Sequence, residues 1–307
     1  MSLKFQGYID LPAHNQTGGF DHAAIHRASH QLYVAHTSND SIDVIDCQSH
    51  RYLRSISNLT GVAGALVSDE RNLNFTSNRG EDTVGIFSVD DEKNILKIKV
   101  GIRPNGLSFD EKRGLLMAAN VGNPDVANSF TLSIVDVVQR KMSASISVAG
   151  RTRWTVFDSQ ADVFYVNIAN PPQIVVVNAK NPTVIAKSFE IPVEGPHGLD
   201  LDLQGRRLFC ACDGEKLITL ETDSGIITSQ LPLSGVPDVI FYNESLSHLY
   251  VAIGNPGVID VFDTSAMRLL ETVPTEKGAH TIAFDSEHNK IYAFMPETHR
   301  AAIYFDE

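Results

Sequence analysis

Apolar and polar positions alternate along nearly the whole chain, in short runs that turn residues separate. Typical runs are QLYVAH (31–36), SIDVID (41–46) and HLYVAI (248–253), which are rich in β-branched and aromatic residues. Alternation over about four to eight residues is typical of β-strands, and the Gly, Asn, Asp and Pro residues between the runs mark turns. No stretch of helical length is amphipathic. The pattern therefore predicts an all-β chain.

The runs belong to a unit of about 43 residues that occurs seven times, and the seventh copy lacks one strand. Four short strands at this period are the signature of a propeller blade. We therefore expect a seven-bladed β-propeller, with four antiparallel strands per blade, as a single domain over residues 1–307. Residues 4–11 (KFQGYIDL) form an unassigned strand before the first copy. We expect this strand to complete the last blade and close the ring, which removes open sheet edges.

Two blocks, QLYVAHTSNDSIDVID (31–46) and HLYVAIGNPGVIDVFD (248–263), recur with openings such as GIRPNGLSFD and EGPHGLDLD. In these features the chain resembles, over essentially its whole length, the YVTN/YncE-like seven-bladed β-propellers of the lactonase-like superfamily. The resemblance implies the fold. The resemblance does not indicate a particular reaction, because the propellers that this chain resembles include lactonases, metal-dependent lyases and proteins with no known catalysis.

The composition of the chain disfavours some classes of binding partner. With 37 acidic and 25 basic residues among 307, the formal charge is −12. Binding to a phosphate backbone needs clustered Lys and Arg, so nucleic acid is disfavoured, although the resemblance to YncE-like proteins would allow DNA binding. No apolar run approaches about 18 residues and no signal-peptide segment is visible, so we expect no membrane contact. We expect a monomer in the cytoplasm, or in the periplasm if a leader precedes these residues.

Histidines gather where the repeats begin. The copies open at Asp21-His22, Gly64, Asn105, Arg153, His197, Asp238 and His280. In a propeller the innermost strands line the central channel, so we expect a ring at one mouth that consists of His22, Gly64, Asn105, Arg153, His197, Asp238 and His280. Neutral imidazoles of His22, His197 and His280, with a carboxylate nearby, suit a divalent transition metal such as Zn, Mn, Fe or Ni. Calcium is disfavoured, since it prefers oxygen ligands.

Further residues on the same face complete a candidate site. Glu297 and Asp238 are candidates for proton transfer, with Glu297 as the general base acting on a bound water. Contacts to a substrate are expected from Arg153, Trp154, Asn105 and His36. Arg153 offers a fork for a carboxylate and Trp154 an apolar wall. The alternative is that these polar residues only cap strands and hold water in the channel.

Two classes of function remain open. The first is a metal-dependent hydrolase or lyase acting on a small, anionic, lactone-like substrate. The second is a non-catalytic propeller that binds a protein or a small ligand, and the longest loop, residues 120–129, would then be its contact surface. The chain lacks G-x-S-x-G, P-loop, G-x-G-x-x-G and H-E-x-x-H motifs, which disfavours serine hydrolases, nucleotide enzymes and zincins.

Overall fold

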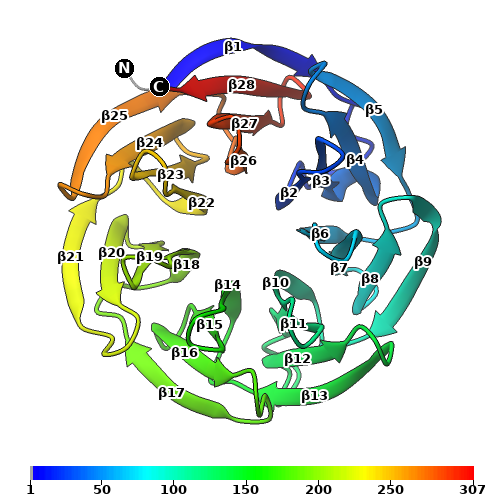
Figure 1. Cartoon of the computed structure of the whole chain (residues 1–307), viewed down its shortest axis with the longest axis vertical. Helices are drawn as coiled ribbons and strands as arrows, with labels where there is room; N and C mark the ends of the chain where they lie inside the picture. Colours follow the sequence, from blue (N-terminus) through cyan, green and yellow to red (C-terminus); the bar gives the residue numbers. More distant parts are fainter. Residues whose placement is uncertain (1–2) are drawn as a thin grey trace.

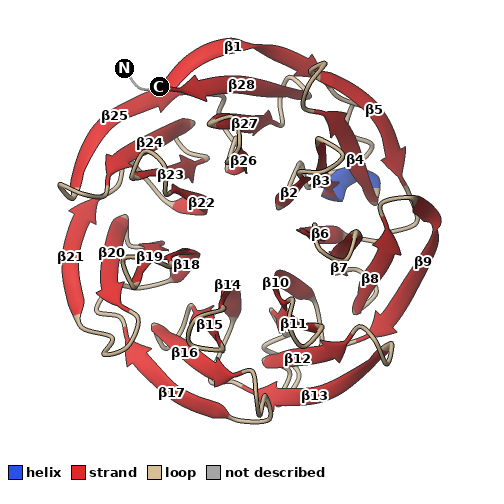
Figure 2. Ribbon diagram, viewed as in Figure 1, coloured by secondary structure: helices blue, strands red, loops and turns tan. Residues whose placement is uncertain are grey.

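Seven four-stranded antiparallel sheets surround a central channel in the computed structural model, which describes residues 3–307 (Figure 1). The predicted seven-bladed β-propeller is thereby confirmed. The one helical element in the described residues is a single 3₁₀ turn, η1 (Thr37–Asn39) (Figure 2). Within those residues no helix is long and apolar enough to cross a membrane.

The strands occupy four concentric positions. The innermost strands are β2 (Ala23–His26), β6 (Val62–Ser68), β10 (Pro104–Asp110), β14 (Thr152–Asp158), β18 (Pro196–Asp202), β22 (Pro237–Asn243) and β26 (Thr281–Asp285). The second strands are β3 (Gln31–His36), β7 (Leu73–Asn78), β11 (Leu115–Asn120), β15 (Val163–Ile168), β19 (Arg207–Cys212), β23 (His248–Ile253) and β27 (Lys290–Met295). The third strands are β4 (Ser41–Asp46), β8 (Thr83–Ser88), β12 (Thr131–Asp136), β16 (Gln173–Asn178), β20 (Lys216–Glu221), β24 (Val258–Asp263) and β28 (Arg300–Asp306). The outermost strands are β5 (Arg51–Ile56), β9 (Asp91–Lys99), β13 (Lys141–Ser147), β17 (Ile185–Glu190), β21 (Ile227–Pro232), β25 (Arg268–Pro274) and β1 (Leu3–Asp10).

The two ends of the chain share the last blade, as predicted. Strand β1 pairs antiparallel with β28 from Leu3, opposite Asp306, to Asp10, opposite Arg300 (Figure 1). Ile9 of β1 is buried in an apolar cluster between the last and first blades. The ring is therefore closed by hydrogen bonds between the ends of the chain and by apolar packing around them.

The hydrophobic core lies between blades. In β19, for example, Leu208, Phe209 and Cys210 are all fully buried although consecutive side chains point to opposite faces of the sheet. Both faces of a blade are covered by its neighbours, so both carry apolar residues. Cys210 and Cys212 lie in the cluster between blades four and five. Stacking of the blades therefore orients every inner strand toward one channel.

Candidate functional site

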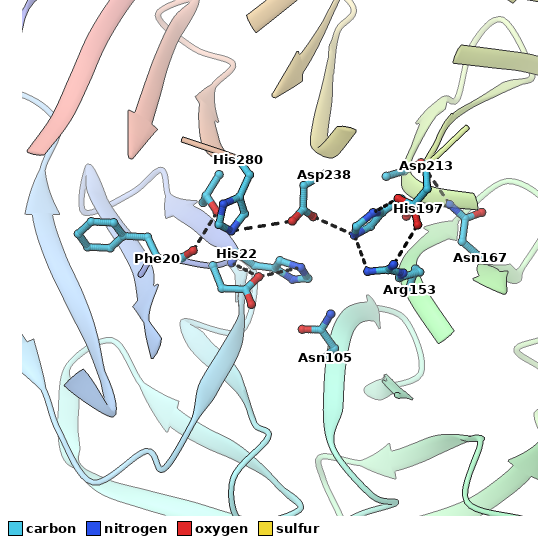
Figure 3. A network of polar contacts seen from close by, with 12 residues as sticks. Phe20, His22, Asn105, Arg153, Asn167, His197, Asp213, Asp238 and His280 are labelled. Atoms are coloured by element: carbon cyan, nitrogen blue, oxygen red, sulfur yellow. Dashed lines mark hydrogen bonds and ion pairs between the residues drawn. The ribbon is translucent and has the colours of Figure 1, made fainter. Parts of the chain in front are cut away.

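The residues at one mouth of the channel sit at β-bulges in the inner strands. In blade five, Pro196 pairs with Cys212 and Gly198 with Ala211, so His197 is the extra residue. Corresponding register shifts contain Ala63, Asn105, Arg153 and Asp238 in four other blades. A bulge bends its strand and re-aims a side chain, and Figure 3 shows Asn105, Arg153, His197 and Asp238 converging around the channel.

Strand pairing corrects the predicted ring in the first two blades. Asp21 and His22 both oppose Ala35, through a bond from the Asp21 N–H to the Ala35 carbonyl (2.9 Å) and one from the Ala35 N–H to the His22 carbonyl (2.9 Å). His22 therefore corresponds to Gly198, and Asp21 corresponds to His197. A slip of one residue leaves the apolar pattern recognisable while it exchanges the two faces of a strand. The corrected ring consists of Asp21, Ala63, Asn105, Arg153, His197, Asp238 and His280.

Three other blades carry a glycine at the position equivalent to His22, and each glycine lies close to a ring residue of the next blade. A Cβ atom at Gly198 would stand 2.3 Å from the carbonyl oxygen of Asp238, in the next blade. Gly64 and Gly106 make the same close approach to the carbonyls of Asn105 and Arg153. Without a side chain at these positions, adjacent inner strands can bring consecutive ring residues together.

Asp238 is the centre of a charged cluster. Its Oδ1 lies 3.2 Å from Nε2 of His197, and its Oδ2 lies 3.9 Å from Nε2 of His280 (Figure 3). On the far side of His197, Nδ1 lies 2.7 Å from Oδ1 of Asp213. Arg153 donates from Nη2 to Oδ2 of Asp213 at 3.0 Å. The imidazole of His197 is therefore held between two carboxylates.

These contacts set the charge of His197. Burial lowers its pKa, but Asp238 and Asp213 outweigh burial and raise the pKa to about 9. Burial in turn acts to raise the pKa of Asp238, yet the neighbouring histidines, His197 foremost, hold it well below its usual range. His197 is therefore an imidazolium at neutral pH, and both of its nitrogens donate to carboxylates. The 3.0 Å approach of Arg153 Nη1 to His197 Nε2 then brings two cations together, and Asp213 bridges them.

His22 and Trp154 are in contact inside the channel. The ring of His22 lies against that of Trp154, with centroids 4.0 Å apart and planes inclined by 49°. The two residues occupy equivalent positions in blades one and four, so they meet across the axis. Burial lowers the pKa of His22, although Asp21 acts in the opposite direction, so its imidazole is neutral at physiological pH. The pair forms the floor of the mouth.

Arginines gather on one side of the mouth. Arg79, in the turn after β7, donates from Nη2 to Oδ1 of Asn105 at 2.5 Å and lies 3.2 Å from Oδ2 of Asp21. Arg151 is exposed, and within residues 3–307 no carboxylate forms an ion pair with it. Burial lowers the pKa of Arg151, as do three neighbouring arginines, Arg153, Arg79 and Arg103, whereas Asp213 acts in the opposite direction. The surroundings of Arg151 are therefore electropositive, on a chain of formal charge −12.

The structure brings together most of the predicted site residues and separates two of them. Asn105, Arg153 and Trp154 lie at the mouth. His36 does not, because its side chain is completely buried, with Nδ1 2.7 Å from Oδ2 of Asp43. The buried side chain of His36 therefore cannot contact a ligand in the channel. Glu297 is exposed in the turn after β27, and no hydrogen bond or ion pair among residues 3–307 joins its carboxylate to the ring.

Two of the three histidines predicted to bind a metal, His197 and His280, are engaged in polar contacts at this mouth. Metal binding needs neutral imidazoles with a free nitrogen. His197 is charged, and both its nitrogens contact carboxylates. His280 lies 2.7 Å through Nδ1 from the carbonyl of Gly278. In the part of the chain that the structure describes, no group of three or more His, Cys, Asp or Glu side chains is placed to hold a metal. The metal centre stays a prediction from the sequence.

Sequence reasoning missed Arg79 and Asp21 as parts of the mouth. Arg79 directly follows Asn78, the last residue of β7, so its position in the repeat was a usable signal. Asp21 was hidden by the register error in blade one. Arg151 and Arg153 are two residues apart in blade four, but their approach to Arg79 and Arg103, from blades two and three, had no signal in the sequence.

No family model matches the chain, and no curated protein matches it. Solved structures share its fold. Kuenenia stuttgartiensis hydrazine synthase is 13% identical over 95% of this chain and 96% of that chain, with a TM-score of 0.81. A chain in the crystal structure of the mitotic checkpoint complex is 11% identical over 99% of this chain and 92% of that chain, with a TM-score of 0.82. Identities this low show the fold alone, and a fold does not imply a function.

Proposed function

We propose that this propeller binds a small anionic molecule at the mouth of its channel. The observation that carries the proposal is the exposed guanidinium of Arg151, which has Arg79, Arg103 and Arg153 as neighbours and no carboxylate partner within residues 3–307. Repulsion among guanidinium groups is relieved when an anion binds between them. Their planar forks suit carboxylate and phosphate groups, which accept two parallel hydrogen bonds.

The rest of the mouth supports a ligand of limited size. Arg153 is held by Asp213 on one side and faces the imidazolium of His197, so its direction is set before a ligand arrives. The rings of His22 and Trp154 form the floor and prevent deep entry into the channel. Preorganised groups of this kind reduce the entropy lost on binding.

Calorimetric titration tests the proposal. Inorganic phosphate, malonate and citrate would be titrated into the protein at low ionic strength, where surface charges are least screened. We expect Arg151→Ala and Arg153→Ala each to weaken binding by roughly 10- to 100-fold, since a hydrogen bond to a charged group contributes about 1.5–3 kcal/mol. Arg140→Ala, an exposed arginine in the turn before β13, is the matched control. Equal affinities for Arg151→Ala and the control would refute the proposal, as would no binding of any of these anions.

Hydrolysis or elimination on a lactone-like substrate is a second candidate function. One observation favours it: His22 is a neutral imidazole with Nε2 3.3 Å from Oδ1 of Asp21, which resembles a base with its orienting carboxylate. Asp238 is poorly suited as a base, because its lowered pKa gives it little affinity for a proton. Release of acid from gluconolactone, measured at constant pH and lost in His22→Gln, would support this function; no release above the rate in buffer would contradict it.

The metal centre predicted at His22, His197 and His280 is tested separately. Elemental analysis of the purified protein, and thermal unfolding with added Zn²⁺, Mn²⁺ or Ni²⁺, would detect it. One bound metal per chain that is lost in His280→Ala would confirm it, whereas no bound metal and an unchanged melting temperature would contradict it. Kinship with the YVTN/YncE-like propellers likewise remains a proposal, which rests on the recurring blocks at 31–46 and 248–263.

A further inference from the structure

A cavity lies on the side of the His22–Trp154 pair that faces away from the charged cluster. Its volume is about 420 Å³, and it occupies the channel between that pair and the opposite face of the propeller. Aromatic rings form much of its wall: Trp154, Phe109, Phe157, Phe241 and Phe284. Exposed residues at the turns after two inner strands, Arg27 and Ser286, also line it, so it reaches solvent at the face opposite the arginine mouth. A cavity of this size accommodates a small organic molecule.

One carboxylate stands in this wall. Asp200 of β18 pairs with Phe209 of β19, and the equivalent inner-strand residues in the other six blades are all uncharged. These equivalents are Ala24, Leu66, Ser108, Val156, Phe241 and Ala283. A carboxylate at this one position is not required by the repeat, because six blades form the same strand pair without it.

The carboxylate of Asp200 still has acceptor capacity. Its Oδ1 accepts the N–H of Leu201 at 2.8 Å, and its Oδ2 accepts the N–H of Tyr242 at 2.6 Å. Each carboxylate oxygen can accept two hydrogen bonds, so one lone pair on each oxygen remains. Burial raises the pKa of Asp200 to about 6, and the two backbone bonds only partly oppose that rise. Within residues 3–307 no cationic side chain forms an ion pair with it.

The open end of the cavity is acidic. Glu111 and Asp285 line it. Burial raises the pKa of Glu111, as do the nearby charges of Glu70 and Asp69, whereas a hydrogen bond from Ser68 and the charge of Arg71, whose Nε lies 3.6 Å from Oε2 of Glu111, act in the opposite direction. The charge of Arg27 is compensated, because its Nε lies 2.7 Å from Oδ2 of Asp69. Such a rim attracts cations and repels anions.

We propose that this cavity binds an organic ammonium ion, with the ammonium group against Asp200 and an apolar body among the aromatic rings. A carboxylate in a largely apolar wall is stabilised by a cation that donates hydrogen bonds to it. Aromatic ring faces attract ammonium groups, and their area holds the apolar part of the ligand. An anion is opposed by both Asp200 and the rim, and a neutral ligand leaves the carboxylate without a counter-charge.

Three probes with one skeleton test the proposal: 2-phenylethylammonium, 2-phenylethanol and phenylacetate. Trp154 is the one tryptophan of the chain and lines the cavity, so its fluorescence reports occupancy alongside calorimetry. At pH 7.5 we expect the ammonium probe to bind at least about tenfold more tightly than the alcohol. Asp200→Asn should remove that preference, and Asp223→Asn, a carboxylate 81% exposed on the outer face, should keep it. Equal affinity of the two probes for the unmodified protein would overturn the proposal.

A second variant tests the proposal even if Asp200→Asn does not fold. Ala24→Phe fills the cavity and leaves Asp200 in place. We expect it to abolish binding of the ammonium probe, while phosphate binding at the arginine mouth is retained. If Ala24→Phe binds the ammonium probe as the unmodified protein does, the probe lies elsewhere and the proposal fails. The two sites are thus tested independently.

The pH profile gives a further check. Ammonium affinity should fall as the pH drops through about 6, because Asp200 then takes up a proton. The other titratable groups that line the cavity are His22, Arg27, Glu111 and Asp285. The fall should be absent in Asp200→Asn, which separates Asp200 from these groups. A profile that is the same in the variant and the unmodified protein would contradict the assignment.

Discussion

Replacing Asp238 by Asn tests whether His197 is charged, which decides the chemistry of the mouth. Asp238 is the first of the groups that raise the pKa of His197, and the other is Asp213. The amide cannot supply the negative charge, whereas the burial that disfavours an imidazolium remains. We therefore expect the pKa of His197 to fall by at least about one pH unit in the variant. Asp238→Asn keeps the shape of the side chain, so the change is confined to charge.

The size of the expected change in stability follows from the pKa of His197 in the folded state. The interval from 6.5 to about 9 corresponds to about 3 kcal/mol of stabilisation, at about 1.4 kcal/mol for each pH unit. The side chain of His197 is only 13% exposed, so solvent screens this interaction little. Because the pKa of His197 is higher in the folded state, the stabilisation is complete below about pH 6.5 and is lost as the pH rises through about 9. The lowered pKa of Asp238 reflects the same ion pair, so the two pKa shifts describe one stabilisation.

Urea unfolding at pH 6 and pH 9.5, with NMR titration of the His197 ring, measures both quantities. We expect the free energy of unfolding of Asp238→Asn to lie below that of the unmodified protein by up to about 3 kcal/mol at pH 6, with little difference at pH 9.5. Asp223→Asn, whose carboxylate is 81% exposed, should change stability little at either pH. The reasoning is refuted if His197 titrates near 6.5 in the unmodified protein, or if the loss in the variant is equal at both pH values.

Three further changes test the framework of the site. Ile9→Ala, in the strand that closes the ring, should cost about 2–5 kcal/mol in thermal unfolding, and Tyr8→Ala, 54% exposed on the same strand, should cost much less. Gly198→Ala should lower the free energy of unfolding by about 1–3 kcal/mol, because its Cβ would stand 2.3 Å from the Asp238 carbonyl oxygen. NMR should also show a changed pKa of His197. An unchanged stability would refute the close approach. Glu297→Gln should leave phosphate affinity unchanged by calorimetry, since Glu297 is exposed outside the ring, and a loss beyond about threefold would return it to the site.

Much of the fold could be predicted because it follows from local regularities. The runs that predicted strands, such as 31–36 and 248–253, are β3 and β23 at those bounds. The strand left over at the N-terminus had one place to pair, beside the incomplete last copy, and β1 lies there. Apolar alternation and the repeat period act within a few tens of residues, so a single sequence displays them.

The site was predicted less well, because bulges and packing define it. The bulge in blade one shifts the ring position from His22 to Asp21, and the shift appears only in the strand pairing. His36 shares the face of the candidate residues in the repeat, yet its side chain turns into the core toward Asp43. Such differences depend on which neighbour each side chain meets.

The sequence by itself determined that this chain is a closed seven-bladed β-propeller, since periodicity and apolar alternation are properties of consecutive residues. Only the tertiary structure decided the character of the channel. It joined Arg79, Arg151 and Arg153 into an electropositive mouth, placed Asp238 beside His197 so that the imidazole is charged, and set Asp200 in an aromatic cavity at the other end. Coulombic interactions and burial depend on distances through space, and in a ring of blades those distances bear little relation to separation along the chain.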